Sequence, residues 1–249
     1  MGTKQVIDSQ TKTLVCVMSI MLFLIVVFYG CSFGEPEEQP PVFGIVLSFD
    51  DYHPYEWGKH FDLFDKYGAK VTFFVTSGSV SNFMLDAQNR GHEIGFHTIS
   101  HPRLPELSRE QFFYETVSRI GIFRDAGIEL TSFAYTFGDY EPWMNYELLK
   151  YYKIVRGAVG ISMYTKDEMK SGFITATSID NIQFSCDASF RYEISKRLEL
   201  AKDYGKIVNL YSHNISNCDW GITPERLNFV LQKAKKLGLI FYTYRDLQE

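Results

Sequence analysis

The sequence predicts an α/β fold of about seven parallel strands, arranged as a barrel rather than as an open sheet. Short apolar runs rich in β-branched residues alternate with helical patterns along residues 42–249. This alternation is typical of parallel strands joined by right-handed crossovers. The length of 249 residues suits one domain of (β/α)-barrel size, although two small domains would also fit. The acidic and histidine residues that could carry chemistry follow the ends of the apolar runs, where such barrels hold their functional groups.

The order of the elements follows from the apolar runs and from signals for the start and end of helices. Gly68 ends the first helix, Ser108 caps a later one, and Thr223 with Pro224 begins the last. Strands are expected at residues 44–49, 71–75, 93–96, 131–135, 154–155, 173–176, 207–211 and 239–243. Helices are expected at residues 55–67, 83–89, 108–126, 143–152 and 189–204, and from residue 223 onward.

Composition and charge exclude one class of partner. Hydrophobic residues make up 45% of the chain and charged residues 22%, so a substantial core can form. The formal net charge is -5, and no stretch of the sequence forms a basic stripe. A nucleic-acid partner is therefore not expected.

The first thirty residues differ in kind from the rest. Lys4 and Lys12 precede an apolar run from Leu14 to Tyr29, which Gly30 and Cys31 follow. The run is short for a membrane span and suits the apolar region of a signal peptide. A small residue directly before a cysteine resembles a bacterial lipoprotein signal, in which Cys31 would carry the lipid; the alternative is an uncleaved anchor. Either form predicts an exported protein that is held at a membrane of the cell envelope.

Three segments follow from this pattern. Residues 1–30 are expected to be the signal peptide, residues 31–41 an extended acidic, proline-rich tether, and residues 42–249 the domain that carries any activity. In an oxidising compartment Cys186 and Cys218 could form a disulfide, or they could be two separate buried thiols.

Two short patterns predict a metal centre. Asp50 and Asp51 end the first apolar run, and neighbouring side chains on an extended chain point to opposite faces, so the pair could serve a substrate and a metal. His97 and His101 stand four residues apart, which places both on one side of a helix or tight turn. Either pattern alone also fits a solvated turn or a pair of capping histidines. Together with His213 at a later strand end, they favour a site in which Asp51 and the two histidines bind a divalent metal. Zinc is favoured, and cobalt or nickel would also fit.

With these residues in place, the chain resembles the polysaccharide deacetylases, carbohydrate esterase family four. The resemblance covers about residues 42–247 and implies a distorted (β/α) barrel. The segments that carry it are Ser48–Asp51, Ala69–Val75, His97–His101 and Leu210–His213.

The resemblance implies a role for each of these side chains. Asp51, His97 and His101 would hold the divalent metal. Asp50 would be the general base that deprotonates a metal-bound water, and His213 would be the general acid that protonates the leaving amine. This division of labour is chemically sound, because an amide nitrogen is a poor leaving group until it is protonated.

The chain departs from the family in the third motif, Arg-x-Pro-Tyr. Ala134 stands in place of the arginine, Thr136 in place of the proline, and Phe137 in place of the tyrosine. The backbone N–H of Phe137 can still serve as the oxyanion donor, since that donor belongs to the main chain. The missing arginine would orient the base, and Arg156 after the next strand is a candidate replacement or else a surface arginine.

Two further positions stay open. Asp180 or Asp187 could supply the aspartate that tunes the acid histidine. Trp220 could line a pocket for the acetyl group or stack on a sugar ring, or it could belong to the core.

The sequence as a whole predicts a metal-dependent hydrolase that removes N-acetyl groups from a cell-surface or extracellular glycan. One alternative is an O-acetyl ester hydrolase of the same fold, for which His213 would matter less because an alkoxide leaves more easily. Another is a catalytically silent carbohydrate-binding module. Peptidoglycan, chitin-like oligomers and exopolysaccharide remain open as substrates.

Overall fold

Strand β1 (Gly44–Phe49) lies at the centre of the sheet, and all six of its residues are buried. A computed structural model describes residues 2, 42–160 and 162–248, and residues 42–160 with 162–248 form one compact unit. β1 pairs in parallel with β9 along its whole length. Its other edge pairs with β12 at Gly44–Val46 and with β2 at Ser48–Phe49. At Gly44 a side chain would not fit, because an added Cβ would lie 2.5 Å from the carbonyl oxygen of Ile240 on β12.

The main path of the sheet runs in the order β6-β9-β1-β2-β3-β4-β5-β7, and its strands are parallel except that β6 is antiparallel to β9. The strands after β1 are β2 (Thr72–Val75), β3 (Glu93–Phe96), β4 (Ser132–Ala134), β5 (Ile154–Gly157), β6 (Met163–Tyr164), β7 (Phe173–Thr175), β8 (Thr177–Ser178), β9 (Ile207–Ser212) and β12 (Ile240–Tyr242), with a separate pair β10 (Asn214–Ile215) and β11 (Gly221–Ile222).

A two-residue strand closes the sheet on itself. β7 pairs with β5, and one residue later the chain enters β8, which pairs in parallel with β9 at Leu210 and Tyr211. The curled sheet therefore returns to its first strands, and the prediction of a distorted (β/α) barrel is confirmed.

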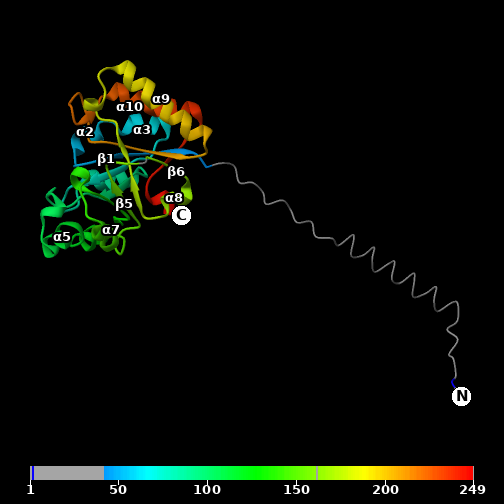
Figure 1. The fold of residues 1–249 in the computed structure, drawn as a ribbon. Coiled ribbons are helices and arrows are strands. Elements are labelled where there is room, and N and C mark those ends of the chain that lie inside the picture. The colour runs from blue at the N-terminus through cyan, green and yellow to red at the C-terminus, as the bar shows by residue number, and fades with distance from the viewer. Residues whose placement is uncertain (1, 3–41, 161, 249) are drawn as a thin grey trace. The chain divides into compact units, whose positions relative to one another are not determined.

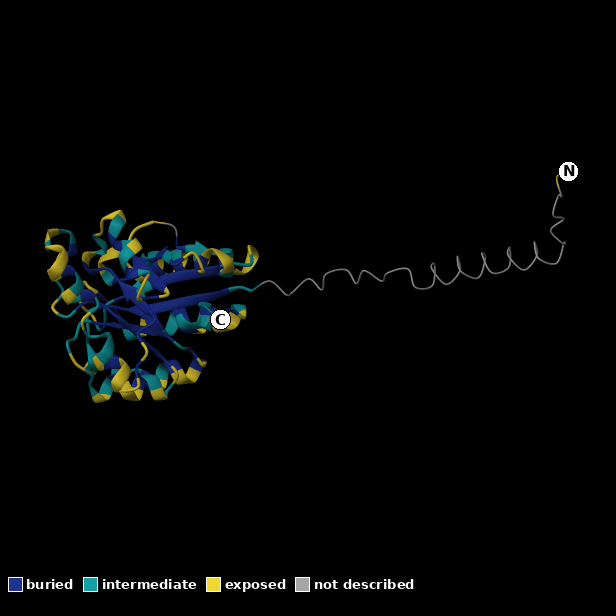
Figure 2. Ribbon diagram, turned by 90° about the horizontal axis from the view of Figure 1, so that it is seen from below, coloured by how far each residue is buried: buried dark blue, intermediate teal, exposed yellow. Residues whose placement is uncertain are grey.

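Helices cover both sides of this sheet. In Figure 1, α3, α9 and α10 lie on one side of the strands, and α5 and α7 lie on the other. Figure 2 shows that the strands between these layers are buried and that the exposed residues belong mainly to the outer faces of helices and to loops. The helices are α2 (Pro54–Gly58), α3 (Phe61–Tyr67), α4 (Asn82–Asn89), α5 (Arg109–Thr116), α6 (Ile120–Asp125), α7 (Pro142–Leu148), α8 (Lys166–Met169), α9 (Asp187–Asp203) and α10 (Pro224–Leu237).

Two expected helices are each split in two. The helix expected at 55–67 breaks after α2, where the Nδ1 atom of His60 lies 2.8 Å from the carbonyl oxygen of Glu56. The helix expected at 108–126 breaks after α5, where Ser118 donates a hydrogen bond to the carbonyl oxygen of Tyr114 at 2.6 Å. Side chains that bond nearby carbonyl groups compete with the helical hydrogen bonds in this way.

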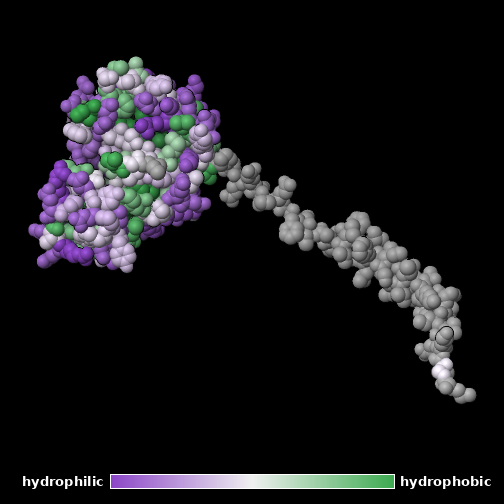
Figure 3. Space-filling model, viewed as in Figure 1, coloured by the Kyte–Doolittle hydropathy of each residue, from purple (hydrophilic) through white to green (hydrophobic). Residues whose placement is uncertain are grey.

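The surface is mainly hydrophilic in the view of Figure 3, with hydrophobic residues scattered among polar ones. Within residues 42–160 and 162–248, no helix is both long enough and apolar enough to span a bilayer. The expected signal peptide, apart from Gly2, and the whole of the expected tether with Cys31 lie outside the described residues.

Candidate active site and metal centre

A cavity of about 780 Å³ opens at the carboxyl ends of the parallel strands. Asp50 and Asp51 follow β1, His97 follows β3, Tyr135 follows β4, and His213 follows β9. These residues are far apart in the sequence, and they meet because the carboxyl ends of parallel strands share one face of the barrel.

The three expected metal ligands come together in this cavity. The Oδ1 atom of Asp51 lies 3.1 Å from Nε2 of His101 and 3.4 Å from Nε2 of His97. One ligand atom from each residue can be chosen so that all three lie within 4.8 Å of one another. Burial opposes ionisation of Asp51, but its contacts with His101 and His97 outweigh that effect and hold its pKa well below the usual range.

This donor set fits a divalent cation. Oδ1 of Asp51 is buried and faces the Nε2 atoms of His97 and His101, so these three atoms can share one cation as ligands. Nδ1 of His97 lies 2.8 Å from the carbonyl oxygen of Ala134, and a proton on Nδ1 would leave Nε2 free to face Asp51. Two imidazole nitrogens and one carboxylate oxygen are the ligands of many sites that keep positions open for water and substrate.

Glu115, on α5, fixes the loop between the two histidines. Its Oε2 atom accepts hydrogen bonds from the backbone N–H groups of Ile99 at 3.0 Å and Ser100 at 2.9 Å. Within the loop, Oγ1 of Thr98 accepts a hydrogen bond from the N–H of His101 at 2.9 Å. The Oε1 atom of Glu115 also accepts a hydrogen bond from the hydroxyl of Ser100 at 2.8 Å. The loop is a tight turn rather than a helix, and Glu115 gives no signal in the sequence because two of its three hydrogen bonds come from backbone N–H groups.

Backbone strain is concentrated at this site. Among the described residues, five that are not glycine have positive φ: Asp51, Tyr52, Thr98, His101 and Phe137. All five lie in the segments that follow β1, β3 and β4. A left-handed backbone is unfavourable for these residue types, and such positions persist where the surrounding structure holds them for function.

Asp50 lies beside the metal ligands and is paired with an arginine. Its Oδ2 atom forms an ion pair and hydrogen bond with Nη2 of Arg156, and both side chains are almost fully buried. Its Oδ1 atom is buried and has no hydrogen-bond partner among the described residues. One oxygen of the expected base is therefore held, and the other is available to accept a proton.

His213 is paired with Asp180, which decides between the two aspartates that the sequence left open. Nδ1 of His213 lies 2.8 Å from Oδ2 of Asp180, whereas Asp187 contacts Arg226 instead. Burial lowers the pKa of His213, but the hydrogen bond to Asp180 and the nearby charge of Asp50 raise it, to about 9. His213 is thus protonated at neutral pH and can donate a proton from Nε2.

Two exposed aromatic residues stand at the rim of the cavity. Phe137 is 53% exposed, and its ring packs against His101 with centroids 4.6 Å apart. Trp220 is 59% exposed, with its ring centroid 5.9 Å from that of His213. The structure therefore places Trp220 at the cavity rather than in the core.

The two cysteines of the domain are free thiols in the structure, and both are exposed. Cys218 also lines the cavity, whereas Cys186 precedes α9. Neither of the arrangements expected from the sequence, a disulfide or two buried thiols, is observed.

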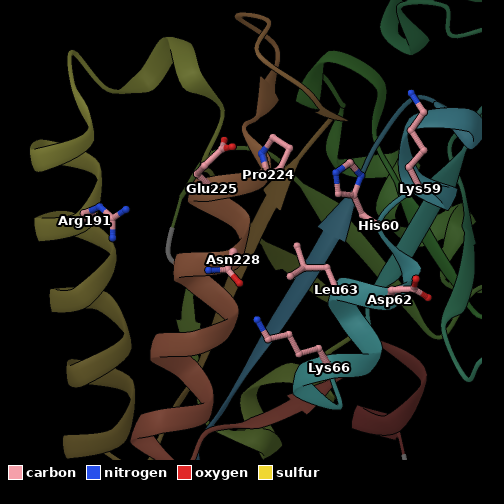
Figure 4. Close-up of a pocket in the computed structure, with 9 residues that line it drawn as sticks. All are labelled: Lys59, His60, Asp62, Leu63, Lys66, Arg191, Pro224, Glu225 and Asn228. Atoms are coloured by element: carbon pink, nitrogen blue, oxygen red, sulfur yellow. The ribbon is translucent and has the colours of Figure 1, made fainter.

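A second cavity, of about 700 Å³, lies between α2 and α3 on one side and α9 and α10 on the other (Figure 4). Its polar side chains carry both charges, among them Lys66, Arg191 and Glu225. None of the nine residues labelled in Figure 4 is buried.

The fold and the site together define a distorted (β/α) barrel with a candidate metal centre at the carboxyl ends of its strands. Comparisons with known proteins confirm the resemblance to the polysaccharide deacetylase family. The family model "Polysaccharide deacetylase" matches residues 37–152. That match includes Asp50, Asp51 and both histidines of the candidate metal centre, and it ends before Arg156 and His213.

Individual relatives agree with this family. A probable peptidoglycan-N-acetylglucosamine deacetylase of Arthroderma benhamiae is 40% identical over 84 residues, 30% of this chain and 19% of that protein. The peptidoglycan-N-acetylglucosamine deacetylase of Bacillus cereus is 31% identical over 88 residues, 34% of this chain and 31% of that protein. The matched part of this chain thus spans less than a third of the length of either relative.

Solved structures show the same fold over most of the chain. The peptidoglycan deacetylase PdaC of Bacillus subtilis superposes with a TM-score of 0.60 at 17% identity, covering 84% of this chain and 92% of that one. The chitin deacetylase of Colletotrichum lindemuthianum gives a TM-score of 0.58 at 16% identity, covering 84% and 88%.

Proposed function

We propose that this protein is a metal-dependent deacetylase that hydrolyses the N-acetyl amide of a glycan. The observation that carries the proposal is the convergence of Asp51, His97 and His101 with a carboxylate and a protonated histidine in one cavity. The names of the relatives, peptidoglycan and chitin deacetylases, support an N-acetylated glycan as the substrate class.

Two residues carry out the proton transfers of the proposed reaction, Asp50 as the acceptor and His213 as the donor. A divalent cation at the three ligands would lower the pKa of a bound water and polarise the acyl oxygen of the substrate. Oδ1 of Asp50, which has no partner among the described residues, accepts a proton as the general base. His213, held by Asp180 through Nδ1, donates a proton to the amide nitrogen as it leaves.

Main-chain and aromatic groups complete the proposed substrate site. The N–H of Phe137 serves as the oxyanion donor, and the left-handed backbone at this residue sets its direction. The ring of Trp220 offers an apolar face on which a sugar ring can stack. We assign zinc to the metal centre in preference to cobalt or nickel, because zinc readily accepts two imidazoles and a carboxylate in an open site.

The location of the protein is part of the same proposal. The apolar run from Leu14 to Tyr29 and the following Gly30-Cys31 support export and lipid attachment at Cys31. A Cys31→Ser variant should lose fatty-acid labelling and shift from the membrane to the soluble fraction, while Cys186→Ser, the matched control, should behave as the wild type. Equal labelling of both variants would refute attachment at Cys31.

The experiment that tests the activity is a measurement of acetate release by the full chain. Chitooligosaccharides and purified peptidoglycan serve as substrates, with metal-loaded and chelator-treated protein compared and Asp50→Asn as the inactive variant. Acetate release that requires both the metal and Asp50 is the expected result. An O-acetylated glycan is assayed in parallel, and release from it alone would support the ester hydrolase. Glycan binding without any release would support the silent binding module, and both results contradict the proposal.

A further inference from the structure

The loop of residues 216–220, between β10 and β11, forms one side of the cavity at the strand ends. Its residues Cys218 and Trp220 line that cavity. The ends of the loop are joined, because β10 pairs with β11 and the N–H of Asn214 donates a hydrogen bond to the carbonyl oxygen of Trp220 at 3.3 Å. The only aromatic ring that Trp220 contacts among the described residues is His213, and the indole is mostly exposed. The direction of the indole therefore depends chiefly on the backbone of the loop.

Asn181 holds the middle of this loop. It begins the short 3-10 helix that follows β8, and its Nδ2 atom donates hydrogen bonds to the carbonyl oxygens of Ser216 at 3.2 Å and Cys218 at 2.8 Å. The N–H of the next residue, Ile182, donates a hydrogen bond to the carbonyl oxygen of Asp219 at 3.1 Å. Two neighbouring residues thus bind three carbonyl groups of the loop, which fixes its backbone at the cavity.

Arg226 on α10 fixes Asn181 from its other side. Nη1 of this buried arginine donates a hydrogen bond to Oδ1 of Asn181 at 3.1 Å, and its Nε donates one to Asp187 at 2.8 Å. The guanidinium carbon also lies 4.9 Å from the ring centroid of Phe190. Both ends of the Asn181 amide are therefore in use, so the oxygen faces Arg226 and the nitrogen faces the loop.

We propose that Asn181 is a positioning residue for Trp220, and that the neighbouring residues Asp180 and Asn181 support separate parts of the site. Asp180 has an extended backbone, and side chains of neighbouring residues on an extended chain point in different directions. Asp180 thus holds the proton donor His213, whereas Asn181 holds the loop whose indole binds a sugar ring of the glycan. The proposal rests on the function proposed above, because it takes a glycan as the ligand of Trp220.

The two supports should differ in their kinetic effect. A sugar ring stacked on Trp220 lies away from the bond that breaks, so the contact is equally strong before and during hydrolysis. A contact of this kind lowers KM without changing kcat. The contact between Asp180 and His213 acts on the proton transfer, and its loss should appear in kcat and in the pH–rate profile.

Steady-state kinetics of acetate release from chitooligosaccharides tests this separation. Asn181→Ala should raise KM by about 3- to 10-fold, the scale of one aromatic contact, with kcat and the alkaline limit of the pH–rate profile unchanged. Trp220→Ala should raise KM by a similar factor, and the double variant should show no further increase. Asn217→Ala, the matched control, removes an exposed amide from the same loop and should behave as the wild type.

Three results would overturn the proposal. One is an unchanged KM in Asn181→Ala, and another is a pair of KM effects that multiply in the double variant. The third is a lower kcat or a shifted alkaline limit in Asn181→Ala, because either would show a general loosening of the segment that carries Asp180. If Asn181→Ala does not fold, Asn181→Asp replaces it, since the aspartate keeps an oxygen for Arg226 and loses the donors to the loop.

Hydrogen exchange tests the support of the loop without a substrate. In Asn181→Ala the amides of residues 216–220 should exchange faster than in the wild type, and those of residues 97–101 should exchange as before. Unchanged exchange in the loop would overturn the proposal.

Binding measurements separate this proposal from the proposed function. If the wild type releases no acetate, calorimetry gives the Kd of the chitooligosaccharide for the same variants. The pattern expected for KM, found instead in Kd, would refute the proposed hydrolysis and uphold the role of Asn181. A wild type that neither binds the chitooligosaccharide nor releases acetate from it or from peptidoglycan would refute both.

Discussion

Two cavities of nearly equal volume, about 780 and about 700 Å³, differ in almost every other respect. The cavity at the strand ends is lined in part by buried polar residues and contains Asp51, His101 and Phe137, whose φ angles are positive. The cavity between the helices (Figure 4) has neither a buried lining residue nor a strained one. Volume alone therefore does not identify a functional site, whereas buried charge and strained backbone do, because both are unfavourable unless something maintains them.

The largest effect is expected for His213, the proposed proton donor in the cavity at the strand ends, and it is compared with His60 in the cavity between the helices. His213→Ala should lower the rate of amide hydrolysis by about 10²- to 10⁴-fold, as expected for loss of a general acid. His60→Ala, the matched control at the helical cavity, should leave the rate near that of the wild type. The rate is measured as acetate release. A similar loss in both variants would show that the two cavities do not differ in function as expected.

The next largest effect is expected when Glu115 no longer holds the loop that carries His97 and His101. Glu115→Ala removes the acceptor of the N–H groups of Ile99 and Ser100, so the loop that carries His97 and His101 should loosen. The affinity for zinc should fall by about 10- to 100-fold, as is typical when support for metal ligands is lost. Titration with a competing chelator measures this. Glu110→Ala, at an exposed site in the first turn of the same helix, should bind zinc as the wild type does.

A smaller effect concerns pH. The pKa of His213 is raised from 6.5 to about 9, so its protonated form is favoured by the fold, and both its stabilising effect and its capacity to donate a proton are lost as the pH rises through about 9. In Asp180→Asn the raised pKa should fall, and the alkaline limit of the pH–rate profile should move to lower pH. Asp187→Asn should leave that limit unchanged, and an equal shift in the two variants would contradict the pairing of His213 with Asp180.

The smallest effect is expected at the helical cavity. Lys66→Ala and Arg191→Ala should change the free energy of unfolding by less than about 0.5 kcal/mol, as is usual for exposed positions. Urea unfolding and acetate release measure the two quantities. A marked loss of acetate release in either variant would show that the second cavity also takes part in function.

Much of this architecture was accessible from the sequence, for reasons that differ between regions. The eight expected strands all occur, because buried parallel strands leave continuous apolar runs. The helices at 55–67 and 108–126 were expected to be continuous, and their breaks depend on side chains such as Ser118 that bond nearby carbonyl groups. Local hydrogen bonds of this kind do not show in hydrophobic periodicity.

At the site as well, the sequence reveals some residues and not others. Asp50, Asp51 and the histidines stand out because they follow strand ends. Asp180 and Asp187 could not be separated, since only the pairing of β8 with β9 brings the first of them to His213. Glu115 was missed altogether, because its partners are two backbone N–H groups and the hydroxyl of Ser100, which come together in this arrangement only after folding.

Strand β8, which closes the barrel, determines when during folding His213 gains its partner Asp180. Asp180, the partner of His213, comes two residues after β8, and the N–H of the intervening Ile179 donates to the carbonyl oxygen of Tyr211 on β9. A chain in which this segment has not yet docked therefore lacks the partner of His213, even if β1 and β3 already hold the metal ligands together. Docking of β8 onto β9 completes the barrel and also brings Asp180 to His213, the proposed proton donor. Copies in which β8 has not docked would therefore lack the proposed deacetylase activity.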